Sequence, residues 1–177
     1  MTVQVLPDQS QLIPEADPLS FARQIALRQL TMAPRSRKEL HDKMLAKGVP
    51  DDIAKTVLDR LVEVGLVDDV AYAHMLVRSK TNSRSLAKRA LRIELTKKGI
   101  DPEIQNSVLE DVTDDDEYQM ATELVAKKIR SMGGLSADAR WRRLTGLLAR
   151  KGYPTGITIR VVKEQIAEFA DLEIALD

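Results

Sequence analysis

A threefold internal repeat constrains the fold of this 177-residue chain more than any other feature. A Lys-Gly pair occurs at Lys47-Gly48, Lys98-Gly99 and Lys151-Gly152, so the glycines lie 51 and 53 residues apart. Apolar residues keep register around each glycine in five columns, which are Leu40, Leu91 and Leu144; Met44, Leu95 and Leu148; Val49, Ile100 and Tyr153; Ile53, Ile104 and Ile157; and Val57, Val108 and Val161. Such a pattern predicts one supersecondary unit repeated along the chain.

Each copy is predicted to contain two helices that are joined at the glycine. Residues spaced by four, such as Leu40 and Met44, share one face of a helix, and the glycine after them ends that helix in a left-handed conformation. Cap signals support these starts: Ser36 and Glu39 form a capping box, and Asp101 precedes Pro102 at the first helical position. Weaker cap candidates are Ser83 and Ser136, and a further helix is expected before each pair, at about 20–33, 69–80 and 116–131.

We therefore predict an all-α fold, a tandem array of three three-helix repeats that is elongated and curved. The expected organisation is a disordered N-terminal tail at 1–19, repeats at 20–67, 68–112 and 113–170, and a short acidic tail at 171–177. An array of this kind offers a long face and no closed pocket.

The residues give no sign of an enzyme, a metal site or a cofactor. The chain has no cysteine, and its two histidines, His41 and His74, lack a plausible ligand spacing. The acidic run 114–117 reads as the first turn of a helix capped by Thr113, because it lacks the alternating ligands of a calcium loop. No apolar run is long enough for a membrane span and the start does not look like a signal peptide, so we expect a cytoplasmic protein. We also expect it to be a monomer.

Basic residues are concentrated although the net charge is zero. Residues 78–98 hold eight basic side chains and one acid, Glu94, and residues 127–151 hold eight basic side chains and one acid, Asp138. The matching stretch of the first copy, 35–47, holds five basic and two acidic residues. Two corresponding clusters suit a polyanion or an acidic protein surface, although a solvated helix face is the alternative for each.

The candidate contact residues are fourteen of the cations in these two clusters. They are Arg78, Lys80, Arg84, Lys88, Arg89, Arg92, Lys97, Lys98, Lys127, Lys128, Arg130, Arg140, Arg142 and Arg143. Within the second cluster, Trp141 is either a core residue, because it precedes Leu144 by three positions, or a platform on which a base stacks.

Several stretches resemble the RecX family. They are Arg35-Ser36-Arg37-Lys38-Glu39-Leu40 with Leu45-Ala46-Lys47-Gly48, then Leu66-Val67-Asp68-Asp69-Val70-Ala71-Tyr72-Ala73, then Leu91 to Ile100, and more loosely Leu147 to Tyr153. The order and spacing of these motifs carry the resemblance, which covers roughly residues 20–168. Where the family often has a glycine before the middle helix of the second repeat, this chain has Ser85-Leu86.

The resemblance implies tandem three-helix repeats and a regulator that is not an enzyme and needs no cofactor. RecX proteins bind RecA filaments on single-stranded DNA in the filament groove, and they dampen ATP hydrolysis, strand exchange and co-protease activity in DNA repair and the SOS response. The partner expected from this resemblance is therefore the RecA filament, with weak direct DNA binding possible in addition. The alternative from the residues alone is a helical protein that acts directly on nucleic acid.

Overall fold

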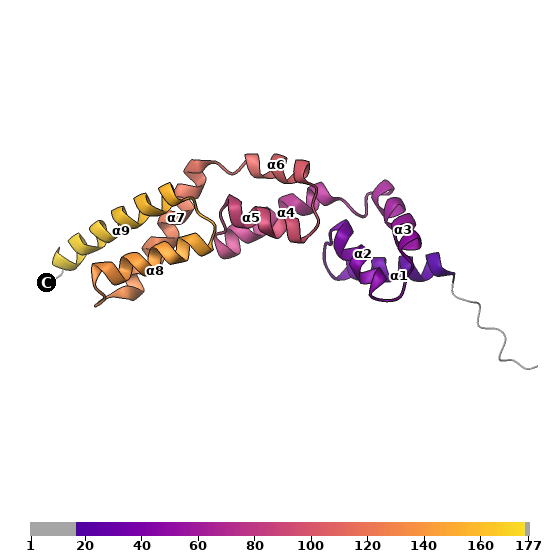
Figure 1. Cartoon of the computed structure of the whole chain (residues 1–177), viewed down its shortest axis with the longest axis horizontal. Helices are drawn as coiled ribbons and strands as arrows, with labels where there is room; N and C mark the ends of the chain where they lie inside the picture. The colour runs from indigo at the N-terminus through magenta and orange to yellow at the C-terminus, as the bar shows by residue number, and fades with distance from the viewer. Residues whose placement is uncertain (1–16, 176–177) are drawn as a thin grey trace, which may run out of the picture. The chain divides into compact units, whose positions relative to one another are not determined.

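The computed structural model describes residues 17–175, and all regular structure within that range is helical (Figure 1). The all-α prediction is confirmed. Most of the expected N-terminal tail, residues 1–16, lies outside the described range, as do residues 176 and 177. The first helix begins at Pro18, because the Asp17 carboxylate accepts a hydrogen bond from the backbone nitrogen of Leu19 at 3.2 Å.

The first repeat packs helix α1 (Pro18–Met32) against α2 (Arg37–Leu45) and α3 (Asp51–Glu63). The predicted capping box at the start of α2 is present, since Ser36 and Glu39 exchange side-chain and backbone hydrogen bonds at 3.2 Å each. Two small residues of α1, Ala22 and Ala26, are fully buried and allow close packing on the core of this repeat.

The second repeat consists of α4 (Asp69–Arg84), α5 (Lys88–Lys97) and α6 (Pro102–Glu110). Helix α4 packs against both of its partners, and its buried residues Tyr72, Ala73, Leu76 and Val77 join the core of α5 and α6. The predicted N-cap Asp101 is confirmed, because its carboxylate accepts from the backbone nitrogen of Glu103 at 2.8 Å.

The third repeat holds α7 (Asp114–Ile129), the short 3₁₀ helix η2 (Arg130–Met132), α8 (Ala137–Arg150) and α9 (Thr155–Ala175). Helix α9 lies alongside both α7 and α8 (Figure 1), and it extends into the segment 171–177 that we expected to be a tail. Thr113 and Ser136 cap α7 and α8 as predicted.

The register of the sequence repeat correctly predicts the core residues of all three repeats. Four of the five apolar columns are buried in every copy, and the Ile53, Ile104 and Ile157 column is partly buried in every copy. The glycines Gly48, Gly99 and Gly152 all have positive φ, between 70° and 86°, so they end their helices in the left-handed conformation expected of them.

The segment between α4 and α5 differs from the prediction. Ser83 was wrong as a cap, because α4 continues through it to Arg84 and the hydroxyl of Ser83 donates to the carbonyl of Ser79 at 2.6 Å within that helix. The turn instead follows at Ser85, whose φ of 48° is the one positive value of a non-glycine residue between residues 17 and 175. The N-cap position of α5 is Ala87, which has no side-chain cap of its own.

The chain divides into two compact units, residues 1–68 and 69–177, so the second and third repeats belong to one unit. The repeat boundaries 20–67, 68–112 and 113–170 remain our proposed division. The curvature of the array concerns the placement of the units relative to each other and stays a prediction.

Candidate ligand-binding surface of the second and third repeats

The second and third repeats join at the turn that precedes α5. The backbone nitrogen of Ala87 donates to the carbonyl of Lys151 at 3.0 Å, and the phenol of Tyr153 donates to the carbonyl of Ser85 at 3.0 Å. The ammonium of Lys151 donates to the carbonyl of Arg84. These bonds attach the start of α5 to the turn between α8 and α9. They therefore connect the basic helix α5 of the second repeat to the basic helix α8 of the third.

A buried carboxylate completes this junction. Glu117 of α7 is 2% exposed, and its Oε1 accepts a hydrogen bond from the backbone nitrogen of Lys88 at 2.6 Å. Burial raises the pKa of the Glu117 carboxyl, and the hydrogen bond from Lys88 opposes that rise. Burial also raises the pKa of Tyr153 to about 12, so its phenol stays protonated as a donor.

The cations of α5 lie on its exposed side. Arg89 is exposed and forms no ion pair among the described residues, whereas Arg92 donates to the side-chain oxygen of Asn106 at 2.7 Å. Lys97 pairs with Glu94 at 3.0 Å, and this hydrogen bond lowers the pKa of the Glu94 carboxyl. Arg89 is therefore the cation of α5 that is best placed to meet a ligand.

A basic cavity of about 560 Å³ lies between α7 and α8. Its charged lining residues are all cations, namely Lys128, Arg142, Arg143 and Arg150, with Met132, Ala139 and Leu147 between them. Arg142 and Arg143 are exposed and form no ion pair within residues 17–172. An anion reaching this surface meets several positive charges and no carboxylate in the cavity wall.

Arg140 and Trp141 differ from their neighbours on α8. Arg140 is 6% exposed, its guanidinium lies 4.7 Å from the centre of the Phe169 ring, and its Nε donates to the carbonyl of Met132 at 3.3 Å. Trp141 is half-buried against the core and also lines a cavity beside α9. Both interpretations of Trp141 thus have support, and the contacts of Arg140 suit a structural role.

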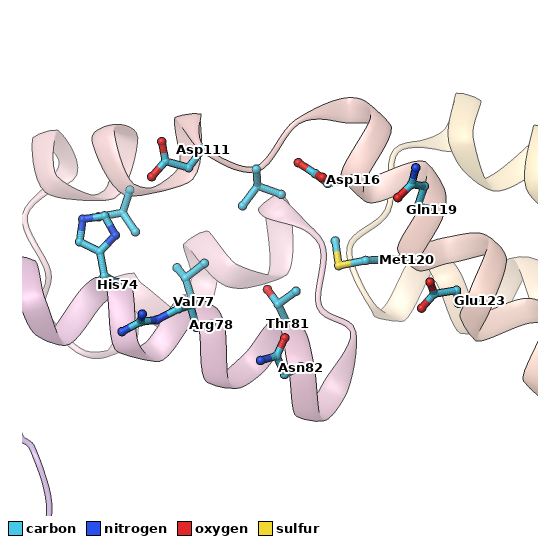
Figure 2. Close-up of a pocket in the computed structure, with 12 residues that line it drawn as sticks. His74, Val77, Arg78, Thr81, Asn82, Asp111, Asp116, Gln119, Met120 and Glu123 are labelled. Atoms are coloured by element: carbon cyan, nitrogen blue, oxygen red, sulfur yellow. The ribbon is translucent and has the colours of Figure 1, made fainter.

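Arg78 lines a different kind of cavity. This cavity of about 390 Å³ lies among α4, α6 and α7, and Figure 2 shows Arg78 and His74 on α4 with Asp116 and Glu123 on α7. Asp111 also lines it. Because its lining contains both acidic and basic side chains, this cavity is less suited to a polyanion than the basic cavity between α7 and α8.

The remaining predicted cations lie near helix ends. Lys80 is half-buried and Arg84 is exposed at the end of α4, and both lower the pKa of Glu94 by their charge, after the larger effect of Lys97. Lys98 is the C-cap residue of α5, and Lys127 and Arg130 are exposed at the end of α7. Basic residues suit these positions, because the C-terminal end of a helix is negative.

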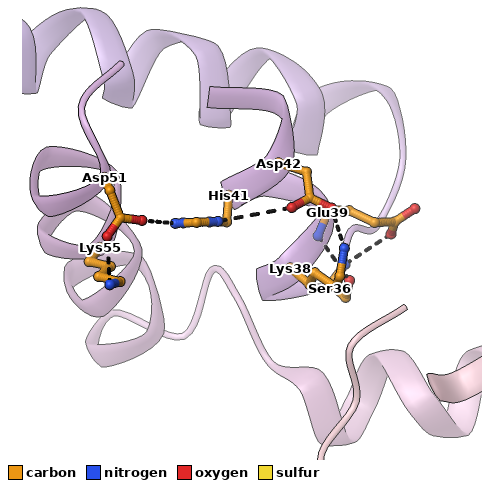
Figure 3. A network of polar contacts seen from close by, with 7 residues as sticks. All are labelled: Ser36, Lys38, Glu39, His41, Asp42, Asp51 and Lys55. Carbon is orange, nitrogen blue, oxygen red and sulfur yellow. Dashed lines mark hydrogen bonds and ion pairs between the residues drawn. The ribbon is translucent and has the colours of Figure 1, made fainter. Parts of the chain in front are cut away.

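Several cations of the first repeat pair with acidic side chains. Arg37 pairs with Asp59 at 2.6 Å, and Lys55 pairs with Asp51 at 2.6 Å. Figure 3 shows Asp51 also bonded to Nε2 of His41, at 2.7 Å. The hydrogen bond from Lys55 and then that from His41 lower the pKa of the Asp51 carboxyl. These ion pairs compensate part of the positive charge of the first repeat.

The described residues hold neither a cluster of metal ligands nor a membrane-spanning helix. No group of three or more His, Cys, Asp or Glu side chains in this range is arranged to hold a metal ion. None of the helices between residues 17 and 175 combines the length and apolar composition that crossing a membrane requires.

Comparison with known proteins assigns the repeats to one family. Family models match in sequence order, with the RecX first three-helix domain over residues 22–61, the second over 68–109 and the third over 114–162. The Regulatory protein RecX of Streptomyces lividans is 42% identical over 155 residues, which cover 88% of this chain and 82% of the relative. That of Amycolatopsis mediterranei is 34% identical over 165 residues, which cover 93% and 94%.

The fold comparison agrees. The crystal structure of RecX from Lactobacillus salivarius matches with a TM-score of 0.74 at 26% sequence identity, covering 85% of this chain and 97% of that one.

Proposed function

The chain belongs to the RecX family of regulatory proteins, which is not a family of enzymes, and on that premise we propose that it binds RecA filaments on single-stranded DNA. Binding mainly inhibits the ATPase, strand-exchange and co-protease activities of RecA, and so regulates DNA repair and the SOS response in the cytoplasm. The protein acts as a monomer.

One structural observation carries the proposal. Arg89 of α5 and Arg142 and Arg143 of α8 are exposed, and none of them forms an ion pair with a described residue. A cation without an acidic neighbour in its own chain keeps its full attraction for an anionic partner. The junction around Ala87 joins the two repeats that carry these cations, and both repeats belong to one compact unit, so they can contact a repetitive partner such as a filament together.

Charge reversal on α5 tests the contact surface. The double variant Arg89→Glu and Arg92→Glu is expected to weaken inhibition of RecA ATPase at least tenfold with unchanged helical content, because both side chains are exposed. The matched control reverses Arg23 and Arg28, two exposed arginines of α1, and is expected to inhibit like the wild type. Equal inhibition curves for the two double variants would remove α5 from the contact surface.

Direct action on nucleic acid is the second candidate function. The basic cavity between α7 and α8 favours this candidate, because the phosphates of nucleic acids bind to clusters of Lys and Arg side chains. Binding to bare DNA without RecA that falls steeply with salt, together with no effect on RecA ATPase, would favour this candidate over the first.

A further inference from the structure

The cavity of about 390 Å³ among α4, α6 and α7 has features that the proposed function does not use (Figure 2). It lies within the compact unit of residues 69–177. Its apolar lining consists of the buried residues Val77 and Val108 and the half-buried residues Val112 and Met120. This cavity therefore offers aliphatic surface to the hydrocarbon part of a ligand.

Helix α7 contributes two carboxylates to the wall of this cavity. Asp116 and Glu123 are exposed and lie two helical turns apart, which is about 10 Å along the helix axis, with Met120 between them. Glu123 forms no hydrogen bond or ion pair with a described residue. The carboxylate of Asp116 accepts from the backbone nitrogen and the hydroxyl of Thr113 through Oδ2 alone. Each carboxylate therefore keeps at least one oxygen for a ligand.

The lining of the cavity carries more negative than positive charge. Asp111 of α6 adds a third carboxylate, and Arg78 is the one Lys or Arg side chain of the lining. His74 and Arg78 lie on α4, whereas Asp116 and Glu123 lie on α7 (Figure 2). The hydrogen bonds from Thr113 lower the pKa of the Asp116 carboxyl, so this group is ionised at neutral pH. The α7 side of the cavity therefore attracts cations.

A threonine of α4 provides an independent observation. Four threonines inside other helices donate their hydroxyls to the carbonyl four residues earlier, namely Thr56, Thr96, Thr122 and Thr145. The hydroxyl of Thr81 is buried but has no partner among the described residues, and Thr81 lines the cavity (Figure 2). A buried hydroxyl without a partner is unusual in a folded protein, and a ligand that supplies the missing hydrogen bond explains it.

These features together define the class of ligand. A linear aliphatic polyamine carries ammonium groups for the carboxylates and methylene groups for the apolar lining. An extended triamine such as spermidine spans the distance between Asp116 and Glu123. A single metal ion is too small to contact both carboxylates, and a lysine side chain brings one charge where the α7 wall offers two acceptors.

We propose that this cavity binds a linear aliphatic polyamine, with its outer ammonium groups at Asp116 and Glu123, an inner amine at Thr81 and its methylene groups on Met120 and Val112. The site needs neither RecA nor nucleic acid, so the inference stands independently of the proposed function.

Calorimetric titration of spermidine into the full-length protein, without RecA or DNA, tests the site. We expect saturable binding of one molecule per chain at about 0.15 M salt, where the attraction between well-separated surface charges is largely screened. No saturable binding at millimolar spermidine would overturn the proposal. Magnesium ions that displace spermidine at equal concentration would also overturn it, because the carboxylates would then attract any cation.

Ligands of different length test whether the two carboxylates are bridged. Putrescine is too short to reach both of them, so we expect it to bind at least tenfold more weakly than spermidine. Equal binding of these two amines would contradict the bridge. A blocked lysine peptide that binds as tightly as spermidine would overturn the polyamine in favour of a lysine side chain from a partner protein.

A charge-neutralising variant assigns the carboxylate. Glu123→Gln is expected to weaken spermidine binding at least tenfold with unchanged helical content, because Glu123 is exposed and has no partner among the described residues. The matched control is Glu103→Gln, which neutralises an exposed acid of α6 outside the cavity and should bind within twofold of the wild type. Equal losses in the two variants would overturn the assignment.

Removal of the Thr81 hydroxyl tests the contact with the inner amine. Thr81→Val keeps the shape of the side chain and should bind spermidine about five times more weakly, the loss of one hydrogen bond. Thermal stability should stay unchanged or rise, because the hydroxyl has no partner in the protein to lose. A diamine as long as spermidine but without its inner amine should bind both proteins equally. The same loss for both ligands, or for neither, would overturn the role of Thr81.

Discussion

The carboxylate of Glu117 lies 2.6 Å from the backbone nitrogen of Lys88 and accepts its hydrogen bond, so a helix of the third repeat caps a helix of the second. Helix α5 lacks a side-chain cap of its own at Ala87. An uncapped helix start in a buried junction would leave donors without partners, and Glu117 removes that cost for one of them. The second repeat therefore depends on the third for the capping of α5.

Loss of this cap is expected to destabilise the unit of residues 69–177. Glu117→Ala should lower the free energy of unfolding by about 1–3 kcal/mol, because the nitrogen of Lys88 loses a charged acceptor in a buried position. Glu117→Gln keeps an acceptor oxygen and should cost less. Urea unfolding followed by circular dichroism measures both, and equal losses of stability for the two variants would show that the hydrogen bond contributes little.

The same carboxyl predicts a pH dependence. Its pKa is raised from 4.5, mainly through burial, so the folded state holds the proton more tightly than the unfolded state does. This contribution to stability is fully present below pH 4.5 and is lost as the pH rises through the folded pKa. The difference in unfolding free energy between the wild type and Glu117→Gln should therefore shift in favour of the wild type as the pH falls to 4.5. A difference that stays constant with pH would contradict this sign.

Ser85 carries backbone strain that glycine would relieve. Its φ of 48° lies in the left-handed region, which costs a non-glycine residue about 1–2 kcal/mol. Glycine also loses more entropy on folding, so we expect Ser85→Gly to stabilise the protein by a net amount of about 0.5–1 kcal/mol. Ser85→Ala keeps the Cβ and should give no gain, so a higher urea midpoint for the alanine variant would sink this explanation.

Gly152 is required for space as well as for conformation. A Cβ at this residue would lie 2.6 Å from the backbone nitrogen of Ala90, whereas a Cβ at Gly134, which also has positive φ, would meet nothing within 4 Å. Gly152→Ala should therefore destabilise the protein by about 1–3 kcal/mol more than Gly134→Ala. Thermal unfolding of the two variants provides the comparison. Equal changes in melting temperature would mean that the backbone at Ala90 can move away from the added Cβ at little cost.

The sequence predicts the cores of the repeats well, because burial follows local periodicity and the glycines mark each helix end. Leu40, Leu91 and Leu144 share a column in the sequence and are all at most 1% exposed. The junction between repeats was not predictable in this way. Glu117 looks like one more acid of the run 114–117, and nothing local indicates that it reaches the nitrogen of Lys88 in another repeat.

The candidate surface was predictable only in part. The local density of charge reveals the basic clusters, yet it does not distinguish Arg140 from Arg142, although the first is buried beside Phe169 and the second is exposed. Which cations meet a ligand depends on packing between helices, and that information is absent from residue spacing.

Action on RecA filaments is tested by measuring RecA ATPase on single-stranded DNA while the protein is titrated from far below to one copy per RecA. We expect strong inhibition well below one copy per RecA, since a filament-bound regulator affects many subunits. An unchanged ATPase rate at equimolar protein would contradict the proposed function, and direct binding to nucleic acid would then become the leading explanation of the basic surface.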